Sequence, residues 1–574
     1  MRDGVKLSAN VFRPAVNSRI PAILLRTPYD KGTGMTDNYR AFAEHGYAVV
    51  VQDVRGRYAS GGKFDPLNQE INDGDDTLNW IAKQPWSDGQ VGMLGGSYLG
   101  IAQWKAALSK NPHLKAIFPY VSGDDDYRDR FYSAGGAMKL GHRLLWLAEN
   151  MRIPGFEMPD FKKYTAVLPL RRADSAATGQ RLDMWQAVLN HPTYDAYWKQ
   201  LSTREHLKDI TIPVYSVGGW YDNYVESDLD AFASLTKRKQ PSRVLIGPWA
   251  HNMLTPFDHV NFGKESIIPL RTEEFEWFDY WLRGKQPAVK HLPVKIFVMG
   301  VDRWREEDAW PLARAKSTKY YLASGGKANS LEGDGELVLR HPNSAQSRID
   351  EFLYDPRNPV PTRGGAVCCD QKILPSGPMD QRPVEKRQDV LVYSTPVLAV
   401  DTEVTGAVKV VLWAESSALD TDFTAKLVDV FPSGEARNLT DGVIRARYRE
   451  SLEKPKLLTP GEVTRFVIEA GVTSNVFRAG HRIRLEISSS NFPRFDRNPN
   501  TGRAVADETQ LQTAKQRVWH DRLHRSYLEV PVVPTGGLEL TSGGPTRYVA
   551  KRTLIAETSA TPSQSSPRGA VAKR

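Results

Sequence analysis

The segment VGMLGGSYLGIAQWKAAL, residues 91–108, joins a short apolar strand pattern to a helix pattern. Ser97 stands at the turn between the two, with Gly95, Gly96 and Gly100 around it. Glycine has no Cβ, so it allows the tight backbone and the close strand–helix packing that such a turn needs. The segment therefore predicts a strand–turn–helix unit in which the Ser97 hydroxyl points outward from the end of a sheet.

A serine in such a turn is typical of the nucleophile elbow of α/β-hydrolases. The match to the Gly-x-Ser-x-Gly rule is incomplete, because position 99 is a leucine. An ordinary glycine-rich loop between a strand and a helix is the alternative interpretation. Side chains that follow other strands of the same sheet decide between the two.

Strand and helix patterns alternate on both sides of this segment. The run Tyr47 to Asp53 is continuously apolar, which is typical of a buried parallel strand, and Asp73 to Lys83 predicts a helix. Other strand-like runs are at residues 20–26, 115–119, 212–218 and 243–247. This alternation predicts a parallel sheet that is covered by helices on both faces.

The pattern changes further along the chain. Residues 125–207 are helix-like without a convincing strand, which predicts a helical cap inserted between two parts of the core, residues 1–124 and 208–316. Residues 317–557 contain short alternating strands and predict a jelly-roll β-sandwich, while residues 558–574 predict a disordered tail. The expected fold class is α/β: an α/β-hydrolase core with an inserted helical cap, plus a C-terminal all-β jelly-roll domain.

Composition excludes several classes of protein. The 76 basic and 67 acidic residues are dispersed, so the net charge of +9 does not indicate a nucleic-acid partner. No run of about 18 apolar residues predicts a membrane span. The two cysteines, Cys368 and Cys369, exclude a disulfide framework, and neighbouring cysteines rarely bond to each other because the ring is strained. No motif indicates a metal or another cofactor.

The chain as given shows no signal peptide, which predicts a cytoplasmic protein, or a secreted or periplasmic one if sequence upstream of Met1 is missing.

Two side chains complete a catalytic pattern with Ser97. A serine hydroxyl needs a base that takes its proton, and the base needs a third group that holds its ring. In α/β-hydrolases these groups follow in the order serine, acid, histidine. Asp222 comes shortly after the strand-like run at 212–218, and His251 comes shortly after the run at 243–247. Since open sheets carry their sites at the carboxyl ends of strands, Ser97, Asp222 and His251 are the predicted triad. A turn aspartate and a loop histidine are the alternatives.

Acyl transfer also needs hydrogen-bond donors at the developing oxyanion. The backbone N–H of Tyr98, at the start of the predicted helix, is one candidate. The loop after the first buried strand, residues 26–31, is expected to supply the second, and Tyr29 offers a hydroxyl there. A packed loop aromatic is the alternative interpretation of Tyr29.

Five motifs in this order resemble the cocaine-esterase-like (CocE/NonD) hydrolases, a family related to Xaa-Pro dipeptidyl-peptidases and α-amino-acid ester hydrolases. The motifs are RTPYDK at 26–31, QDVRGR at 52–57, GSYLG at 96–100, GWYD at 219–222 and GPWAH at 247–251. The similarity continues at residues 420–430 and 488–493, so it extends from Met1 to about Val533.

The resemblance implies roles for individual residues. It implies a triad of Ser97, Asp222 and His251, and an oxyanion hole made by the Tyr29 hydroxyl and the Tyr98 amide. It also implies an acyl pocket lined by Phe131, Trp146 and Tyr224, with Cys368 and Cys369 in a jelly-roll loop near this pocket. For the cysteines, burial as apolar side chains is the alternative.

One departure bears on the substrate. In relatives that act on α-amino acyl groups, the sequence at the catalytic acid resembles Asp-x-Glu-Asp. Here Asp222 is followed instead by Asn223, Tyr224 and Val225. A buried ammonium without carboxylates is costly, although Glu226 and Asp124 to Asp126 remain candidate partners. The prediction is a cofactor-independent serine hydrolase that cleaves small carboxylic esters or amides through an acyl-enzyme on Ser97.

The alternatives are an Xaa-Pro dipeptidyl-peptidase, an α-amino-acid ester hydrolase, and a binding protein with an inactive core. The sequence does not decide the oligomeric state, and a homo-oligomer is one of the alternatives.

Overall fold

The computed structural model describes residues 1–254, 257–341, 349–368, 370–534 and 546–547. Its helices are α1 (Asp37–Glu44), α2 (Glu70–Ala82), α3 (Tyr98–Leu108), α4 (Leu140–Asn150), α5 (Phe161–Thr165), α6 (Ala173–Thr178), α7 (Asp183–Asn190), α8 (Ala196–Leu201), α9 (Val225–Lys237), α10 (Leu270–Arg283) and α11 (Arg382–Glu385). Shorter helical turns are η1 (Asp126–Phe131), η2 (Leu170–Arg172), η3 (Arg204–Asp209), η4 (Lys264–Ser266) and η5 (Ala446–Tyr448).

The first sheet contains β1 (Ala9–Phe12), β2 (Ile20–Thr27), β3 (Ala48–Asp53), β4 (Ser87–Gly96), β5 (Leu114–Tyr120), β6 (Val214–Tyr221), β7 (Ser242–Ala250), β8 (Val294–Val298), β9 (Arg303–Glu307) and β21 (Thr546–Arg547). The second contains β10 (Lys316–Ala323), β11 (Glu336–Val338), β12 (Ile349–Tyr354), β13 (Leu391–Ser394), β14 (Thr402–Ser416), β15 (Asp422–Val430), β16 (Ala436–Arg445), β17 (Thr464–Phe477), β18 (Arg482–Ser488), β19 (Ala514–Trp519) and β20 (Tyr527–Val533).

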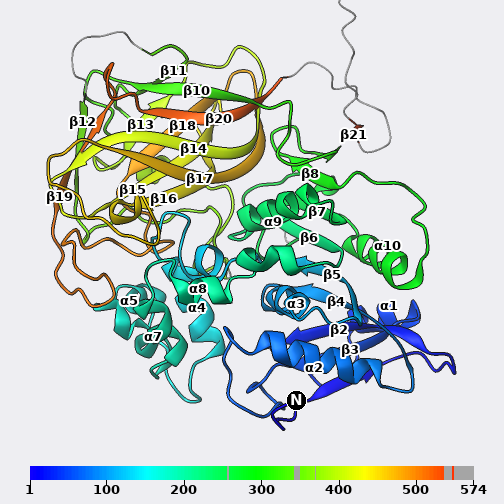
Figure 1. Ribbon diagram of the computed structural model, residues 1–574. Helices are drawn as coiled ribbons and strands as arrows, with labels where there is room; N and C mark the ends of the chain where they lie inside the picture. The colour runs from blue at the N-terminus through cyan, green and yellow to red at the C-terminus, as the bar shows by residue number, and fades with distance from the viewer. Residues whose placement is uncertain (255–256, 342–348, 369, 535–545, 548–574) are drawn as a thin grey trace, which may run out of the picture.

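The first sheet has the order β1-β3-β2-β4-β5-β6-β7-β8-β9-β21 (Figure 1). From β3 to β8 all neighbouring strands are parallel, while β1 and β9 pair antiparallel with β3 and β8. Every residue of β3 and β6 is buried, as expected for parallel strands with both faces covered. The predicted α/β core is confirmed, and β8 and β9 extend it beyond the strands read from the sequence.

Helices pack on both faces of this sheet. On one face α2, α3 and α9 bury Leu78, Trp104 and Leu235. On the other face α1 and α10 bury Phe42 and Phe278. The helix expected from Asp73 begins three residues earlier, at Glu70. Both carboxylates are buried in the first turn and pair with arginines, Glu70 with Arg26 and Asp73 with Arg55.

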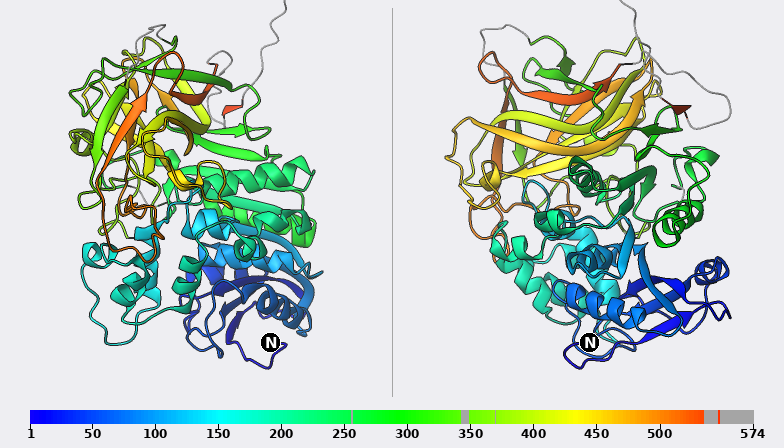
Figure 2. Two further views of the ribbon diagram at one scale, coloured as in Figure 1. Left: turned by 60° about the vertical axis from the view of Figure 1, so that its left-hand side comes forward. Right: turned by 45° about the vertical axis from the view of Figure 1, so that its right-hand side comes forward.

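The segment between β5 and β6 is helical and is called the cap below, from η1 to η3 (Figure 2). Its hydrophobic cluster includes Leu144, Tyr164, Trp185 and Trp198 and continues into the α/β core through Val54, Leu67 and Tyr98. A cluster this large holds α4, the helix that faces Ser97, in a defined position. Among the described residues no helix is both long and apolar enough to cross a bilayer.

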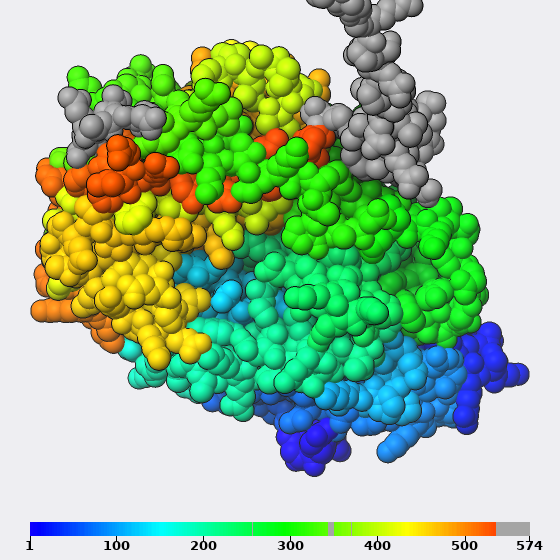
Figure 3. All heavy atoms as spheres, turned by 45° about the horizontal axis from the view of Figure 1, so that its top comes forward, coloured from blue at the N-terminus to red at the C-terminus, as the bar shows by residue number. Residues whose placement is uncertain are grey.

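The second sheet forms the C-terminal all-β domain, which packs directly against the cap and the α/β core (Figure 3). Its hydrophobic core continues into the first sheet through Trp220 of β6 and Phe297 of β8. The start of α4 is tied to this domain, since the Leu140 and Gly141 amides donate to the carbonyls of Arg494 (3.0 Å) and Pro493 (2.7 Å). Three parts of the chain therefore meet at α4. The tail predicted at 558–574 lies outside the described residues.

Candidate active site

Ser97 occupies the sharp turn between β4 and α3. Its backbone has φ +55° and ψ −121°, a conformation that is strained for a residue with a side chain. Gly95 has φ +131°, and a Cβ on Gly100 would lie only 2.5 Å from Ser122 Cβ. The glycines are therefore required here, one for its backbone angle and the other for close packing of α3 against the end of β5.

Ser97, His251 and Asp222 form one hydrogen-bonded chain. His251 Nε2 lies 3.0 Å from Ser97 Oγ, and His251 Nδ1 lies 2.7 Å from Asp222 Oδ1. A carboxylate only accepts, so Nδ1–H donates to Asp222 and leaves Nε2 free to accept from the serine hydroxyl. Asp222 is fully buried, and its second oxygen accepts the Tyr224 amide at 3.0 Å. The three side chains singled out in the sequence follow β4, β7 and β6, and the geometry suits removal of the serine proton.

Tyr29 lies in the loop after β2 and reaches the same place. Trp146 Nε1 donates to the Tyr29 hydroxyl oxygen at 3.1 Å, so the hydroxyl proton remains available to another acceptor. Burial of the hydroxyl raises the pKa of Tyr29, while hydrogen bonds with Trp146 and Ser97 oppose this shift. The phenol therefore stays protonated at neutral pH and can act as a donor.

Two side chains, Asp53 at the end of β3 and Arg57 shortly after it, hold the Tyr29 loop in place. Arg57 donates to the Pro28 carbonyl at 3.0 Å and to the Asn150 carbonyl at 2.8 Å. Asp53 accepts the Lys31 amide at 2.8 Å. These contacts explain why the motif at residues 52–57 accompanies the motif at 26–31, and they link the loop to the C-terminal end of α4.

Tyr98 begins α3, and its N–H is among the first amides of that helix, which have no partner within it. The Tyr98 hydroxyl points elsewhere and donates to Glu70 at 2.9 Å. Only the backbone of Tyr98 is therefore placed to serve an oxyanion beside Ser97.

A small cavity of about 20 Å³ adjoins Ser97. Its walls come from the core, the cap and the all-β domain: Tyr29, Ser97, Tyr98, Ile101, Arg130, His142, Arg143, Trp146, Tyr224, His251 and Cys368. Trp146, Tyr224 and Cys368 were singled out in the sequence. Phe131 does not line the cavity; it is 1% exposed and lies beneath Arg143, whose guanidinium carbon is 4.9 Å from the ring centre.

Cys368 requires a correction. It is buried, and it is disulfide-bonded. No described cysteine is free, and the sequence has one other cysteine, Cys369, which lies outside the described residues. The expectation that Cys368 stays unbonded is wrong. Because Cys368 is disulfide-bonded, it has no free thiol that could act as a nucleophile. It therefore contributes an apolar sulfur atom to the cavity wall.

Three polar residues of the cavity wall were missed in the sequence: Arg130, His142 and Arg143. His142 and Arg143 lie four and three residues before Trp146 on α4, so all three share one face of that helix. This spacing is the signal that could have found them once Trp146 was placed in the pocket.

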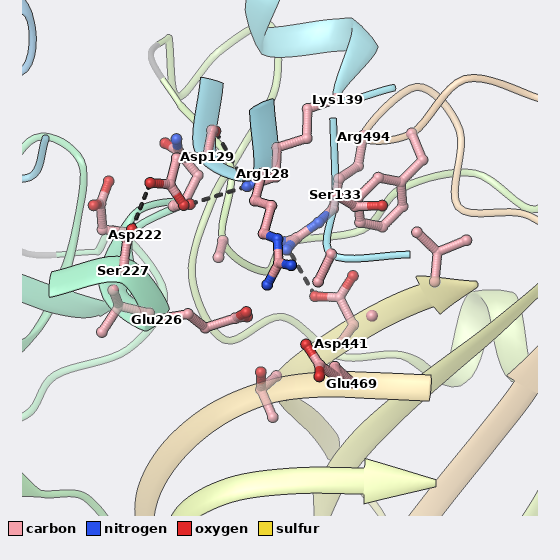
Figure 4. Close-up of a pocket in the computed structure, with 18 of the residues that line it drawn as sticks. Arg128, Asp129, Ser133, Lys139, Asp222, Glu226, Ser227, Asp441, Glu469 and Arg494 are labelled. Carbon is pink, nitrogen blue, oxygen red and sulfur yellow. Dashed lines mark hydrogen bonds and ion pairs between the residues drawn. The ribbon is translucent and has the colours of Figure 1, made fainter. Parts of the chain in front are cut away.

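A second, more polar cavity is lined in part by Asp222 (Figure 4). Lys139 donates to the carbonyls of Asp129 and Asn223, at 3.2 Å each. Burial raises the pKa of Asp129 to about 7, opposed by Arg204 and supported by neighbouring carboxylates. Burial, with Asp222 nearby, also raises the pKa of Asp228 well above its ordinary value. The raised pKa values of Asp129 and Asp228 favour their neutral forms, which reduces the negative charge packed around Asp222.

Comparison with known proteins gives the chain its relatives. The family model described as X-Pro dipeptidyl-peptidase (S15 family) matches residues 3–253, and the X-Pro dipeptidyl-peptidase C-terminal non-catalytic domain matches residues 288–529. Cocaine esterase of Rhodococcus sp. (strain MB1 Bresler) is 40% identical over 565 residues, covering 93% of this chain and 97% of that protein.

Two solved structures share the whole architecture. An aminopeptidase from a marine sediment archaeon, Thaumarchaeota archaeon, superposes with a TM-score of 0.82 at 26% identity, covering 93% of this chain and 95% of that one. An α-amino acid ester hydrolase superposes with a TM-score of 0.81 at 27% identity, with the same coverage of 93% and 95%.

Proposed function

Because the chain belongs to the CocE/NonD family of serine hydrolases, related to the S15 X-Pro dipeptidyl-peptidases, we propose that its ester-cleaving activity is carried by Ser97, His251 and Asp222. The observation that carries the proposal is the hydrogen-bonded chain of these side chains, with 3.0 and 2.7 Å contacts, beside a cavity. An enzyme that hydrolyses esters needs an activated nucleophile, and Ser97 is in hydrogen-bonding reach of its base.

In the first half of the reaction, His251 Nε2 takes the Ser97 proton as Oγ attacks the ester carbonyl. Asp222 keeps the ring in the required tautomer and stabilises the imidazolium that forms. The Tyr29 hydroxyl and the Tyr98 amide stabilise the oxyanion. His251 then returns the proton to the departing alcohol, and an acyl-enzyme on Ser97 remains. Water, deprotonated by His251, attacks that ester and releases the acid.

The acyl group is proposed to lack a free α-amino group. No Asp or Glu is among the described residues that line the cavity at Ser97. The candidate ammonium partners are engaged elsewhere: Asp126 pairs with Lys105 and Arg130, and Asp124 pairs with Arg204 at 2.9 Å. Glu226 lines the second cavity instead. An ammonium in the first cavity would therefore meet cations and no carboxylate, which opposes the peptidase and amino-ester alternatives.

The test is a steady-state comparison of two aryl esters, one of butyrate and one of the α-amino acid of matching length, 2-aminobutyrate. We expect kcat/KM for butyrate to be at least about tenfold higher, since leaving one cationic group unpaired costs more than 1.4 kcal/mol. Ser97→Ala serves as the control for spontaneous hydrolysis. A preference for the amino ester would transfer the assignment to the amino-ester or peptidase class.

The Tyr29 role predicts a separate result. Tyr29→Phe removes one oxyanion donor and keeps the ring, so kcat on the butyrate ester should fall about 100-fold with little change in KM. Tyr58→Phe is the matched control, because Tyr58 is 57% exposed and outside the cavity. Both kcat values and thermal melts are measured. An unchanged kcat in Tyr29→Phe would mean that the Tyr29 hydroxyl is not an oxyanion donor and that another group acts together with the Tyr98 amide.

A further inference from the structure

Arg143 is the unusual residue of the cavity beside Ser97. It is 6% exposed, and it comes from α4 of the cap. Its Nε donates to the Arg130 carbonyl at 2.9 Å, and its side chain also hydrogen-bonds Tyr224. The guanidinium carbon lies 4.9 Å from the Phe131 ring centre and 6.0 Å from the Trp146 ring centre. The side chain is therefore held in one orientation by neutral groups alone.

No carboxylate of the described chain neutralises this charge. The strongest influences on the Arg143 guanidinium are burial, Tyr224, Arg130 and Tyr29, and burial lowers its pKa. An arginine stays protonated even so, because its ordinary pKa lies far above neutral pH. Other buried arginines of the protein have partners: Arg26 pairs with Glu70, and Arg445 pairs with Asp422 at 2.9 Å. Arg143 departs from this rule, and a buried cation without a counter-charge is costly.

The neighbouring groups do not supply the missing negative charge. Arg130, also in the cavity wall, has a carboxylate partner in Asp126, which it shares with Lys105. His142 is 1% exposed, and neither of its ring nitrogens has a hydrogen-bond partner within the described chain. Burial, with Arg143 and Lys139 nearby, lowers the pKa of His142 well below its ordinary value, so the ring is neutral. The cavity thus presents one cation without a carboxylate partner, Arg143, and one neutral imidazole with open hydrogen-bonding positions.

We propose that Arg143 binds a carboxylate carried by the acyl part of the ester substrate, with His142 as an additional hydrogen-bond donor. The enzyme would then act on half-esters of dicarboxylic acids. A guanidinium matches a carboxylate in a two-point contact, which adds geometric selectivity to the charge pairing. The acyl side is specified because Arg143 lines the same small cavity as Ser97, together with Trp146 and Tyr224, so a carboxylate bound there lies near the acyl carbon that Ser97 attacks. This inference rests on the proposed function.

The first test needs no variant. Mono-p-nitrophenyl adipate, which has a free carboxylate, is compared with p-nitrophenyl methyl adipate, in which the same position is a neutral ester. Buffers are free of chloride, since chloride can occupy an arginine site. We expect kcat/KM at least about tenfold higher for the free carboxylate, as for a charge-assisted hydrogen-bonded pair. Equal or lower kcat/KM for the carboxylate overturns the inference. Spontaneous hydrolysis is subtracted with Ser97→Ala.

The variants assign the preference to Arg143. In Arg143→Met the ratio of the two kcat/KM values should fall to about one, and Arg143→Lys should restore part of it because the charge returns without the planar fork. Arg497→Gln is the matched control: Arg497 also stacks on an aromatic ring, 5.3 Å from the centre of Phe492, but lies outside the cavity. Its ratio should equal that of the wild type. A wild-type ratio in Arg143→Met would overturn the assignment.

A further measurement covers the case in which Arg143→Met does not fold. Adipate should inhibit wild-type hydrolysis of the butyrate ester at least about tenfold more strongly than adipamide, its uncharged analogue of equal chain length. Equal inhibition counts against the inference. Failure of the proposed function looks different, because no ester would then be hydrolysed in a Ser97-dependent way.

Discussion

Ser97→Ala is expected to lower kcat on the butyrate ester by about 10⁶-fold, because the variant has no atom that can form the acyl-enzyme. Residual hydrolysis should come only from binding and oxyanion stabilisation. Labelling by a fluorophosphonate probe, which reacts with activated serines, should also disappear. The measurements are burst and steady-state kinetics, with intact-mass detection of the labelled protein.

Ser122→Ala is the control for this experiment. Ser122 is a second buried serine near α3, and its Oγ has no hydrogen-bond partner within the described chain. Its removal should leave both kcat and probe labelling unchanged. If Ser97→Ala retained more than about 1% of wild-type kcat with a normal thermal melt, another residue would have to be the nucleophile.

Asp222→Asn is expected to lower kcat by about 10⁴-fold with little effect on KM. The Asp222 carboxylate accepts from His251 Nδ1 at 2.7 Å, whereas an asparagine amide can donate to Nδ1 and so leave the proton on Nε2. His251 would then be unable to accept the Ser97 proton. The measurement is kcat across the pH range in which wild-type activity is constant.

Asp228→Asn provides a demanding control, because Asp228 is an equally buried carboxyl close to Asp222. Burial raises its pKa and so favours the neutral acid, and the amide is an uncharged group of similar shape. We expect kcat to change less than about threefold, which separates the role of Asp222 from a general effect of burying an amide. A similar loss in both variants would indicate that the buried carboxyl cluster acts only structurally.

The parts of the fold that follow from short-range patterns were predictable. The apolar run of β3 and the glycines around Ser97 are local signals, and each leaves its mark within a few residues of sequence. The positions of Asp222 and His251 were also predictable, because side chains that follow parallel strands meet at one edge of the sheet. Their hydrogen bonds to each other and to Ser97 agree with that reasoning, and the variants above test what they do.

Strand β9 shows what local patterns miss. Its sequence, RWREE, has the charge of a surface loop, yet Arg305, Glu306 and Glu307 are buried. They are tolerated because Arg305 pairs with Glu403 of the all-β domain at 2.7 Å, and Glu307 pairs with Arg314. Arg314 follows soon after the strand, but Glu403 is 98 residues further along the chain and belongs to the all-β domain. Buried charge can therefore be recognised only when the domains are assembled.

The chain sequence by itself determined the class of fold, the order of the catalytic candidates and the family, since these depend on local periodicity and on motifs of a few residues. Tertiary structure alone decided which side chains surround Ser97. Arg143, His142 and Cys368 reach the cavity only because α4 and a loop of the all-β domain are packed against the core. Whether a buried charge is paired is likewise a property of all its neighbours together, and for Arg143 the missing carboxylate becomes visible only in three dimensions.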